Sequence, residues 1–497
     1  MLGTYITFPE LLIWLPFIAG ILCFFLKREV PAKTVAIIAS LLTLGVSIAG
    51  LFYTSDKFTT YNNVNYYWLT YIGNSFNIGL DGTGRILTLL TAIAFPLIFI
   101  ATSKTSYKNA PVFYGLMLLT QTGLMGVFCS VDALLFYFFW ELALIPVYFL
   151  CSKWGGEKSI QTTFKFFVYT FSGSLLMLIG IIYVYQHTGS RIFEDGTVVA
   201  HSFSLNAFYN ANLNAAEQNW LFWLFFVAFA VKMPIFPFHT WQPDTYDQSP
   251  ASVTMVLSGI MVKMGLFGVI RWLIPVFPLA TVQFSHIVMI LCITGIIYAS
   301  CIAMVQDNLK KLVAYSSIAH IGLMCAALFA SNEISVQGVM LQMFNHGINI
   351  IGLWIVVEMV ERQTGIKTIS RLGGIANKAP VLTVMLVIIA LANIALPLTN
   401  AFTGEFLMFS GLYIFNPWYA AFAGIGIILA AVYTLNMIQK IFYGETNAAT
   451  ANVKDISWNE KLVLGIIVSI IFIVGVYPQP LIDLTKQAVD NLVGKLN

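Results

Sequence analysis

Apolar stretches of about twenty residues recur from one end of the chain to the other. A transmembrane helix needs about 20 such residues to cross a hydrocarbon core about 30 Å thick. The pattern therefore predicts an all-α membrane protein that forms a single polytopic membrane domain over residues 1–497. We count fourteen candidate spans: residues 8–26, 33–53, 83–103, 111–129, 131–151, 164–186, 219–240, 251–275, 284–306, 311–331, 335–359, 381–411, 418–443 and 461–478.

The composition excludes several classes of function. Only 9% of the residues are charged, against about 25% in soluble domains. The net charge of +3 is too small to indicate a nucleic-acid partner. The chain has no glycine-rich nucleotide fingerprint and no paired-cysteine motif, so we expect no cofactor and no metal in this chain. The lipid bilayer is the partner that the composition does predict.

The basic residues predict the orientation in the membrane. Seventeen lysines and arginines fall in or beside the loops that follow odd-numbered spans, and six fall on the opposite side. Cytoplasmic loops carry the excess of Lys and Arg. We therefore expect a multi-pass protein of the bacterial inner membrane, with both termini on the periplasmic side, rather than one of an organelle's inner membrane.

Two of the predicted spans contain prolines that break a helix. The seventh span has Pro234 and Pro237, and the twelfth has Pro397. Proline removes a backbone donor and clashes with the preceding turn. The two breaks lie five spans apart, and an odd offset reverses helix direction. We therefore predict two inverted five-helix repeats, spans 4–8 (residues 111–275) and spans 9–13 (residues 284–443), each with a discontinuous helix, as in transporters.

Six titratable residues lie far from the ends of their predicted spans. Five lie nine to thirteen residues into a span, roughly 14–20 Å deep. The sixth follows the Pro397 break. Charged residues inside a membrane are costly and typically mark ion paths or ion pairs. The six candidate site residues are Glu141, Lys232, Lys263, His320, His346 and Glu405.

Each of these residues alone could be half of a structural salt bridge or a packed histidine. Six at similar depth favour a row of proton stations. Lysine can lose its proton in a protein whereas arginine cannot, and histidine titrates near neutrality. We expect Lys232 to hold its proton when Glu141 is close and to release it otherwise. Polar neighbours are expected to hold water or orient the row: Tyr137, Ser316, Ser317, Gln342, Asn345 and Asn349.

Four motifs in this part of the chain belong together. They are Phe139-Trp140-Glu141-Leu142, the segment Lys232 to Asp244 (KMPIFPFHTWQPD), Gly259 to Gly265 (GIMVKMG) and Asp307 to Gly322 (DNLKKLVAYSSIAHIG). Over about residues 110–445 the chain resembles the antiporter-like membrane subunits of respiratory complex I. The resemblance implies a proton-translocating subunit of NADH:quinone oxidoreductase, with no redox site of its own and with neighbouring antiporter-like subunits as partners.

The resemblance also implies that the six residues form a central hydrophilic axis for protons and water. Glu405 is acidic where sister subunits tend to carry lysine, which distinguishes one member of the family, and no long lateral helix is expected after residue 478. One departure is that Thr245-Tyr246-Asp247 replaces the usual Ala-His segment after Asp244.

Other functions fit parts of the pattern. Subunits of multi-subunit Na⁺/H⁺ antiporters and membrane-bound hydrogenases share the resemblance. A Na⁺ site needs several oxygen ligands, whereas the row has two lysines and two histidines, which favours H⁺. A quinone-binding or purely structural anchor is a third reading, because forty Phe could line a groove. Packing and lipid contact explain these rings more simply.

Overall fold

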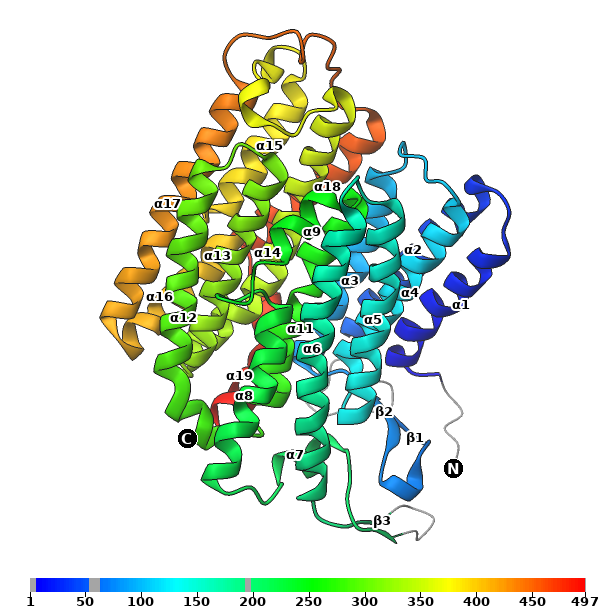
Figure 1. Cartoon of the computed structure of the whole chain (residues 1–497), viewed down its shortest axis with the longest axis vertical. Helices are drawn as coiled ribbons and strands as arrows, with labels where there is room; N and C mark the ends of the chain where they lie inside the picture. The colour runs from blue at the N-terminus through cyan, green and yellow to red at the C-terminus, as the bar shows by residue number, and fades with distance from the viewer. Residues whose placement is uncertain (1–5, 53–62, 193–197, 497) are drawn as a thin grey trace.

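The computed structural model describes residues 6–52, 63–192 and 198–496. Its long helices lie side by side along one common direction (Figure 1), with α1 and α2 at one edge of the bundle and α16 and α17 at the other. The long uninterrupted helices are α1 (Phe8–Phe25), α2 (Glu29–Phe52), α3 (Gly82–Ala101), α4 (Ala110–Cys129), α5 (Ala133–Trp154), α6 (Ser159–Gln186), α12 (Pro278–Val305), α13 (Leu309–Phe329), α14 (Glu333–Thr364), α17 (Pro417–Phe442) and α18 (Trp458–Val476).

The number of membrane spans depends on how interrupted helices are counted. In the described part of the chain, twelve helical stretches are long and apolar enough to cross a membrane: the eleven above and residues 251–273. The other two predicted spans, 219–240 and 381–411, fall on helices that break midway. The all-α membrane class is confirmed, while the count of fourteen and the inverted repeats stay predictions.

The first break follows α8 (Ala215–Lys232) and lasts until α9 (Gln242–Gln248) begins. The amide of Ile235 donates to the carbonyl of Ala230 at 2.9 Å, and the indole N–H of Trp241 donates to Val231 O at 2.9 Å. Backbone groups freed by the break therefore find partners inside the protein, as the low-dielectric surroundings require.

The second break separates α15 (Pro380–Asn393) from α16 (Asn400–Phe415). Ala395 and Leu398 adopt positive φ angles of 56° and 73°. L-residues with a Cβ rarely adopt this conformation, and doing so costs of order 1–3 kcal/mol each. The break therefore stores backbone strain in addition to the interruption caused by Pro397.

Residues 251–273 form an irregular helix: α10 (Ala251–Val256), η2 (Leu257–Met261), α11 (Lys263–Gly268) and η3 (Val269–Leu273). The two η segments are π-helical turns, which are frequent at functional sites. They lie on either side of the segment that carries Lys263. Every residue of this span's most apolar window is buried.

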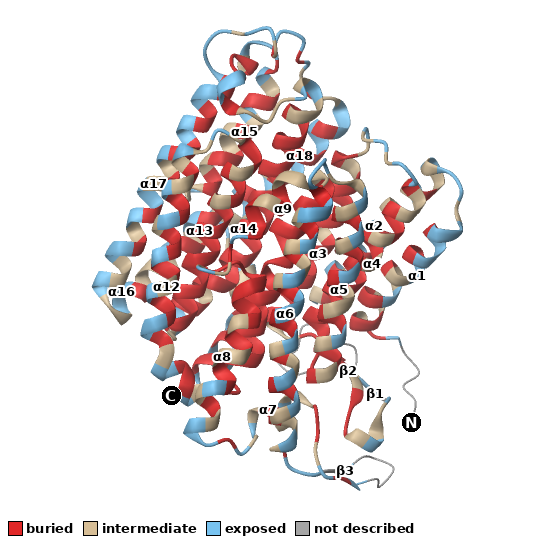
Figure 2. Ribbon diagram, viewed as in Figure 1, coloured by how far each residue is buried: buried red, intermediate tan, exposed pale blue. Residues whose placement is uncertain are grey.

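The helices differ in how far they are buried (Figure 2). The most apolar windows of α13 and α14 are 94% and 100% buried, whereas those of α2 and α18 are 33% and 28% buried. The outer helices therefore present apolar side chains to the lipid. A central helix such as α14 has protein on all sides, which allows it to carry polar residues at mid-depth.

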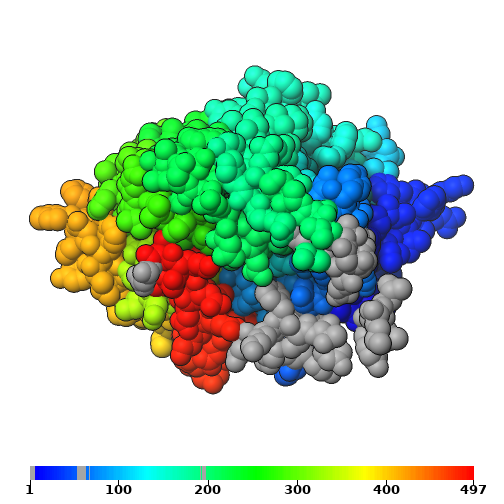
Figure 3. Space-filling model, turned by 90° about the horizontal axis from the view of Figure 1, so that it is seen from below, coloured from blue at the N-terminus to red at the C-terminus, as the bar shows by residue number. Residues whose placement is uncertain are grey.

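One end of the bundle carries structure where the sequence predicted only connections. The hairpin β1 (Asn63–Tyr67) with β2 (Ser75–Gly79), the pair β3 (Arg191–Ile192) with β4 (Val198–Val199), and α7 (Leu205–Tyr209) lie there. The amphipathic helix α19 (Gln479–Val493) packs against α3 and α14 at the same end (Figure 3). It has 15 residues.

Candidate functional site

Glu141 of α5 and Lys232 at the end of α8 form the first part of the row. Both lie inside the bundle, and Lys232 is 1% exposed. No ion pair within 4.0 Å joins them among the described residues, and neither Lys232 Nζ nor Glu141 Oε1 has a hydrogen-bond partner there. The pair is therefore seen in the separated arrangement of the two that the sequence predicted.

Aromatic rings surround the ammonium group of Lys232 instead. Its Nζ lies 5.5 Å from the ring centroid of Trp140 and 6.0 Å from that of Phe166. Cation–π contacts of this kind stabilise a desolvated cation by about 2 kcal/mol or more. They do so without supplying an acceptor that would hold the proton in place.

Sequence reasoning missed one polar neighbour of Glu141. Ser174 of α6 lies beside both the Glu141 carboxyl group and the hydroxyl of Tyr137. It occurs in a segment of small residues, and nothing in its own spacing distinguishes it from a packing serine. Tyr137, which the sequence placed one turn before Glu141, belongs to this cluster as expected.

Lys263 continues the row on α11 and contacts the second half of the molecule. Its Nζ lies 3.0 Å from Ser258 O and 2.8 Å from Nδ1 of His346 on α14. Gly265 allows α11 to approach α8 closely here, because a Cβ at this position would lie 2.7 Å from Phe229 O. Close packing of these helices therefore fixes Lys263 near the end of α8.

His346, His320 and Glu405 complete the row, with no hydrogen bond between the two imidazoles in the described structure. The imidazole centroids of His346 and His320 lie 5.6 Å apart. His320 Nδ1 lies 3.2 Å from Glu405 Oε1, which also accepts a 3.2 Å hydrogen bond from Gln342 Nε2. A cavity of about 20 Å³ borders His320 and Glu405, large enough for one water molecule. Four helices thus bring Lys263, His346, His320 and Glu405 into one row of neighbouring side chains.

The polar residues beside the histidines differ in what they do. Gln342 contacts a site residue, as expected. Asn345 and Asn349 do not contact an imidazole: their side-chain amides donate to the carbonyl and the Oδ1 of Asn400, at 2.7 and 3.0 Å. These bonds join α14 to the first residue of α16, and a role of the two amides in holding water stays a prediction.

Ser316 makes two contacts that the sequence did not reveal. Its Oγ accepts hydrogen bonds from the hydroxyl of Tyr433 at 3.0 Å and from Nδ2 of Asn393 at 3.4 Å. Nδ2 of Asn393 also lies 3.4 Å from Nε2 of His320. Asn393 is the last residue of α15, so its distance in sequence from His320 concealed this contact.

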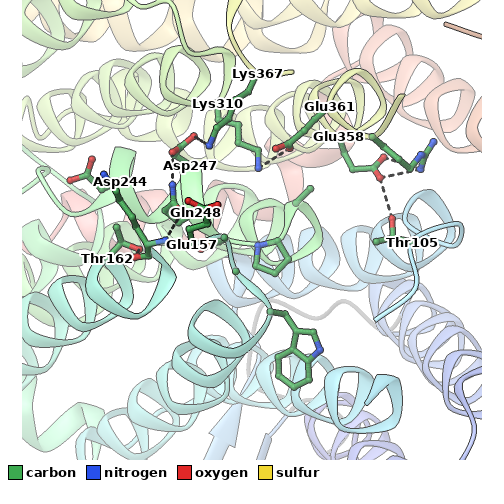
Figure 4. A pocket seen from close by; sticks show the side chains of 18 of the residues that line it. Thr105, Glu157, Thr162, Asp244, Asp247, Gln248, Lys310, Glu358, Glu361 and Lys367 are labelled. Carbon is green, nitrogen blue, oxygen red and sulfur yellow. Dashed lines mark hydrogen bonds and ion pairs between the residues drawn. The ribbon is translucent and has the colours of Figure 1, made fainter. Parts of the chain in front are cut away.

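A polar vestibule of about 1270 Å³ lies at the end of the bundle away from β1 and β2. Figure 4 shows that charged side chains from several helices point into it. Asp244 on α9 contacts Lys165 of α6 and Lys311 of α13, each at 3.1 Å. Asp247 contacts Lys367 at 2.7 Å and accepts from Asn308 Nδ2 at 2.8 Å.

These ion pairs determine the charge of the two aspartates. Burial alone raises the pKa of Asp247, but the hydrogen bonds from Lys367 and Asn308 more than reverse this and lower the pKa. Burial opposes the Lys165 and Lys311 contacts in the same way at Asp244, whose pKa is also lowered. Asp247 is the last of the three residues, Thr245-Tyr246-Asp247, that depart from the expected motif, and its contacts anchor α9.

The site offers no cluster suited to a metal ion. In residues 6–52, 63–192 and 198–496, no three His, Cys, Asp or Glu side chains come together in a metal-binding arrangement. What the row can do chemically is exchange protons between neighbouring side chains. A buried line of titratable groups beside two broken helices defines the class of antiporter-like ion-translocating membrane proteins.

Comparisons with known proteins give the family. Residues 130–430 match the family model described as NADH:quinone oxidoreductase/Mrp antiporter, TM. NADH-quinone oxidoreductase subunit M of Rickettsia prowazekii is 34% identical over 97% of this chain and 98% of the relative. The Escherichia coli K12 protein of the same name is 30% identical over 97% and 96%. This chain belongs to the NADH:quinone oxidoreductase/Mrp antiporter membrane family, in its complex I subunit M branch.

Solved structures agree with this assignment. A chain of the respiratory complex I from Thermus thermophilus with bound NADH matches with a TM-score of 0.89 and 27% identity, over 98% of this chain and 99% of that one. A chain of the Mrp complex from Dietzia sp. DQ12-45-1b matches with a TM-score of 0.85 at 17% identity, over 99% of both, which shows a common fold alone. The Na⁺/H⁺ antiporter and hydrogenase alternatives are not favoured.

Proposed function

We propose that this chain translocates protons as an antiporter-like subunit of NADH:quinone oxidoreductase, along the row from Glu141 to Glu405. Oxidation of NADH and reduction of quinone take place in other subunits, and the coupling reaches this chain through charge and conformation. The observation that carries the proposal is the row of neighbouring titratable groups in which Lys263 contacts His346, the His346 and His320 imidazoles lie 5.6 Å apart between centroids, and His320 contacts Glu405.

In this proposal Lys232 is the residue whose hold on its proton changes during the cycle. When Glu141 approaches, the ion pair holds the proton on Lys232, and when the pair separates the proton is released towards Lys263. Moving one charge against a potential near 180 mV costs about 4 kcal/mol. A change in pairing equivalent to three pKa units supplies about 4 kcal/mol, so the electrostatic change matches the work.

The finer aspects of location belong to this proposal. The chain lies in the bacterial inner membrane, with the vestibule on the cytoplasmic side and both termini on the periplasmic side. The excess of Lys and Arg in the loops at the vestibule end supports this orientation. Partners are neighbouring antiporter-like subunits, and Glu405 lies towards the edge formed by α16 and α17 where such a subunit fits. No cofactor is proposed in this chain.

Two substitutions test the row. We expect Glu141→Gln and Lys232→Ala each to reduce NADH-driven proton pumping in inverted membrane vesicles by at least about 100-fold, the scale of lost proton-transfer catalysis. Glu445→Gln and Lys440→Ala change exposed residues of the same types and serve as matched controls. Native gels report assembly. Normal pumping by assembled complexes with either axis substitution would disprove the proposal.

A further inference from the structure

Asn393 contacts the ring nitrogen of His320 that faces away from Glu405. Its side-chain Nδ2 lies 3.4 Å from His320 Nε2, while the other ring nitrogen, Nδ1, lies 3.2 Å from Glu405 Oε1. Asn393 is 3% exposed and His320 is 7% exposed. Both nitrogens of this imidazole therefore have defined protein partners, one on each side of the ring.

These partners select one tautomer. An amide NH₂ group only donates, so Nε2 must be the unprotonated acceptor in this arrangement. The single ring proton then resides on Nδ1 and points at the Glu405 carboxylate. In this state His320 is ready to give a proton to Glu405 but has no free nitrogen on which to receive the next one.

Reception requires the amide to turn. If the side chain of Asn393 rotates by 180°, its Oδ1 faces Nε2 and accepts an Nε2–H bond. Ser316 permits both orientations, because its hydroxyl accepts from Nδ2 at 3.4 Å in the observed state and can donate to Oδ1 in the turned one. Tyr433 holds the Ser316 oxygen in place through its 3.0 Å hydrogen bond.

We propose that Asn393 is a positioning residue whose amide orientation controls whether His320 can accept a proton on Nε2, so that the second break gates transfer to Glu405. In one cycle Lys263 gives a proton to His346 Nδ1 as His346 loses one from Nε2, His320 gains that proton on Nε2, and Glu405 gains the proton that leaves His320 Nδ1. A turn of each imidazole ring then returns its remaining proton to the starting position. Charge and protons balance at each step. The inference rests on the proposed function and adds that the orientation of the Asn393 amide controls proton transfer through His320.

The place of Asn393 in the fold links the gate to conformation. It is the last residue of α15, immediately before the segment where Ala395 and Leu398 adopt positive φ. We therefore expect a change in the backbone of the break to alter the direction of the Asn393 side chain. The groups that face His320 are Glu405 from α16, His346 from α14 and Asn393 from α15, with Lys263 of α11 behind His346. Tyr433 of α17 lines the same small cavity as His320 and Glu405.

The test compares two substitutions of similar shape in the assembled complex. Asn393→Asp replaces the donor with a carboxylate that retains the Nε2 proton, so we expect the pH optimum of NADH-driven pumping to rise by about one unit. Asn393→Leu removes both polar atoms, so we expect weaker pumping with no such rise. Asn416→Asp, which keeps its cap on the amide of Trp418, is the control for an added carboxylate.

The outcomes separate this inference from the proposed function. Identical pH profiles for wild type and Asn393→Asp, or the same change in Asn393→Asp and Asn393→Leu, would overturn the gate. His320→Ala is measured alongside. Loss of pumping in His320→Ala with an unchanged Asn393→Asp profile removes the gate alone, whereas normal pumping in His320→Ala removes both proposals.

Discussion

Lys263 and His346 meet in the middle of the bundle, with Nζ 2.8 Å from Nδ1. Lys263 belongs to the last span of the first predicted repeat, and His346 to the third span of the second. Both side chains are buried. This contact is the point at which the row of titratable groups crosses from one half of the chain to the other.

Substitutions of this pair test the crossing. We expect Lys263→Met, which keeps the length of the side chain, to reduce pumping by about 100-fold because proton transfer to His346 is lost. His346→Ala should have a similar effect. Because the two residues act on one step, the double variant should be no worse than either single one. Additive losses in vesicle pumping assays would contradict a shared step.

Gly265 tests the close approach of α11 to α8. A Cβ there meets Phe229 O and Met233 Cβ at 2.7 Å each, so Gly265→Ala must push the two helices apart. We expect the variant to lose about 1–3 kcal/mol of stability, seen as a lower melting temperature of the purified complex, and to pump weakly.

The matched control for Gly265 is Gly424→Ala in α17, where an added Cβ meets nothing within 4 Å. We expect it to be neutral or stabilising by up to about 1 kcal/mol, because alanine favours helix over glycine. Equal melting temperatures for the two alanine variants would contradict the role of helix contact.

Leu398 tests the strain at the second break. With a φ of 73°, Leu398→Gly should relieve strain and stabilise the protein by about 1 kcal/mol in thermal unfolding. Leu396→Gly lies in the same break but not at positive φ, so it should gain nothing and destabilise through added chain entropy. A loss of stability in Leu398→Gly as large as that in Leu396→Gly would count against the strain.

Asp247 gives a pH-dependent prediction. Its pKa is lowered by Lys367 and Asn308 against the opposing effect of burial. A carboxyl group with a lowered folded-state pKa stabilises the protein above its ordinary pKa of about 4. Asp247→Asn should therefore cost about 1–2 kcal/mol near neutral pH.

The difference between wild type and Asp247→Asn should then shrink as the pH falls below about 4 and through the lowered pKa. Melting temperatures measured between pH 3 and 8 check this. Asp483→Asn, at an exposed position of α19, is the control. A stability difference that stays constant down to pH 3 would show that the ion pair is not its source.

The sequence was sufficient to predict the membrane class and both helix breaks, whereas the role of the six residues of the row in proton transfer stays a prediction. The length of an apolar stretch and the position of a proline are properties of neighbouring residues, so spans and helix breaks can be predicted from sequence alone. The second layer of contacts was not predictable. Asn393 reaches His320 only through the turn of the second break, and Asn345 and Asn349 serve Asn400 rather than His346, because partners are chosen by packing between distant segments.

Contacts in the vestibule were likewise not predictable from the sequence. The replacement of the usual motif by Tyr246-Asp247 was visible, but its consequence was not, since Lys367 lies 120 residues away. The absence of an ion pair between Glu141 and Lys232 was also beyond sequence reasoning. It depends on which of two side-chain arrangements the packed bundle adopts.

The short helix α9 has a mechanical consequence for the whole chain. The two carboxylate oxygens of Asp244 pair with different helices, Oδ2 with Lys165 of α6 and Oδ1 with Lys311 of α13. Through Asp244, α9 therefore connects α6 with α13. It directly follows the hinge after Lys232. We therefore expect a displacement of this break to shift α13, the helix that carries His320, through Asp244.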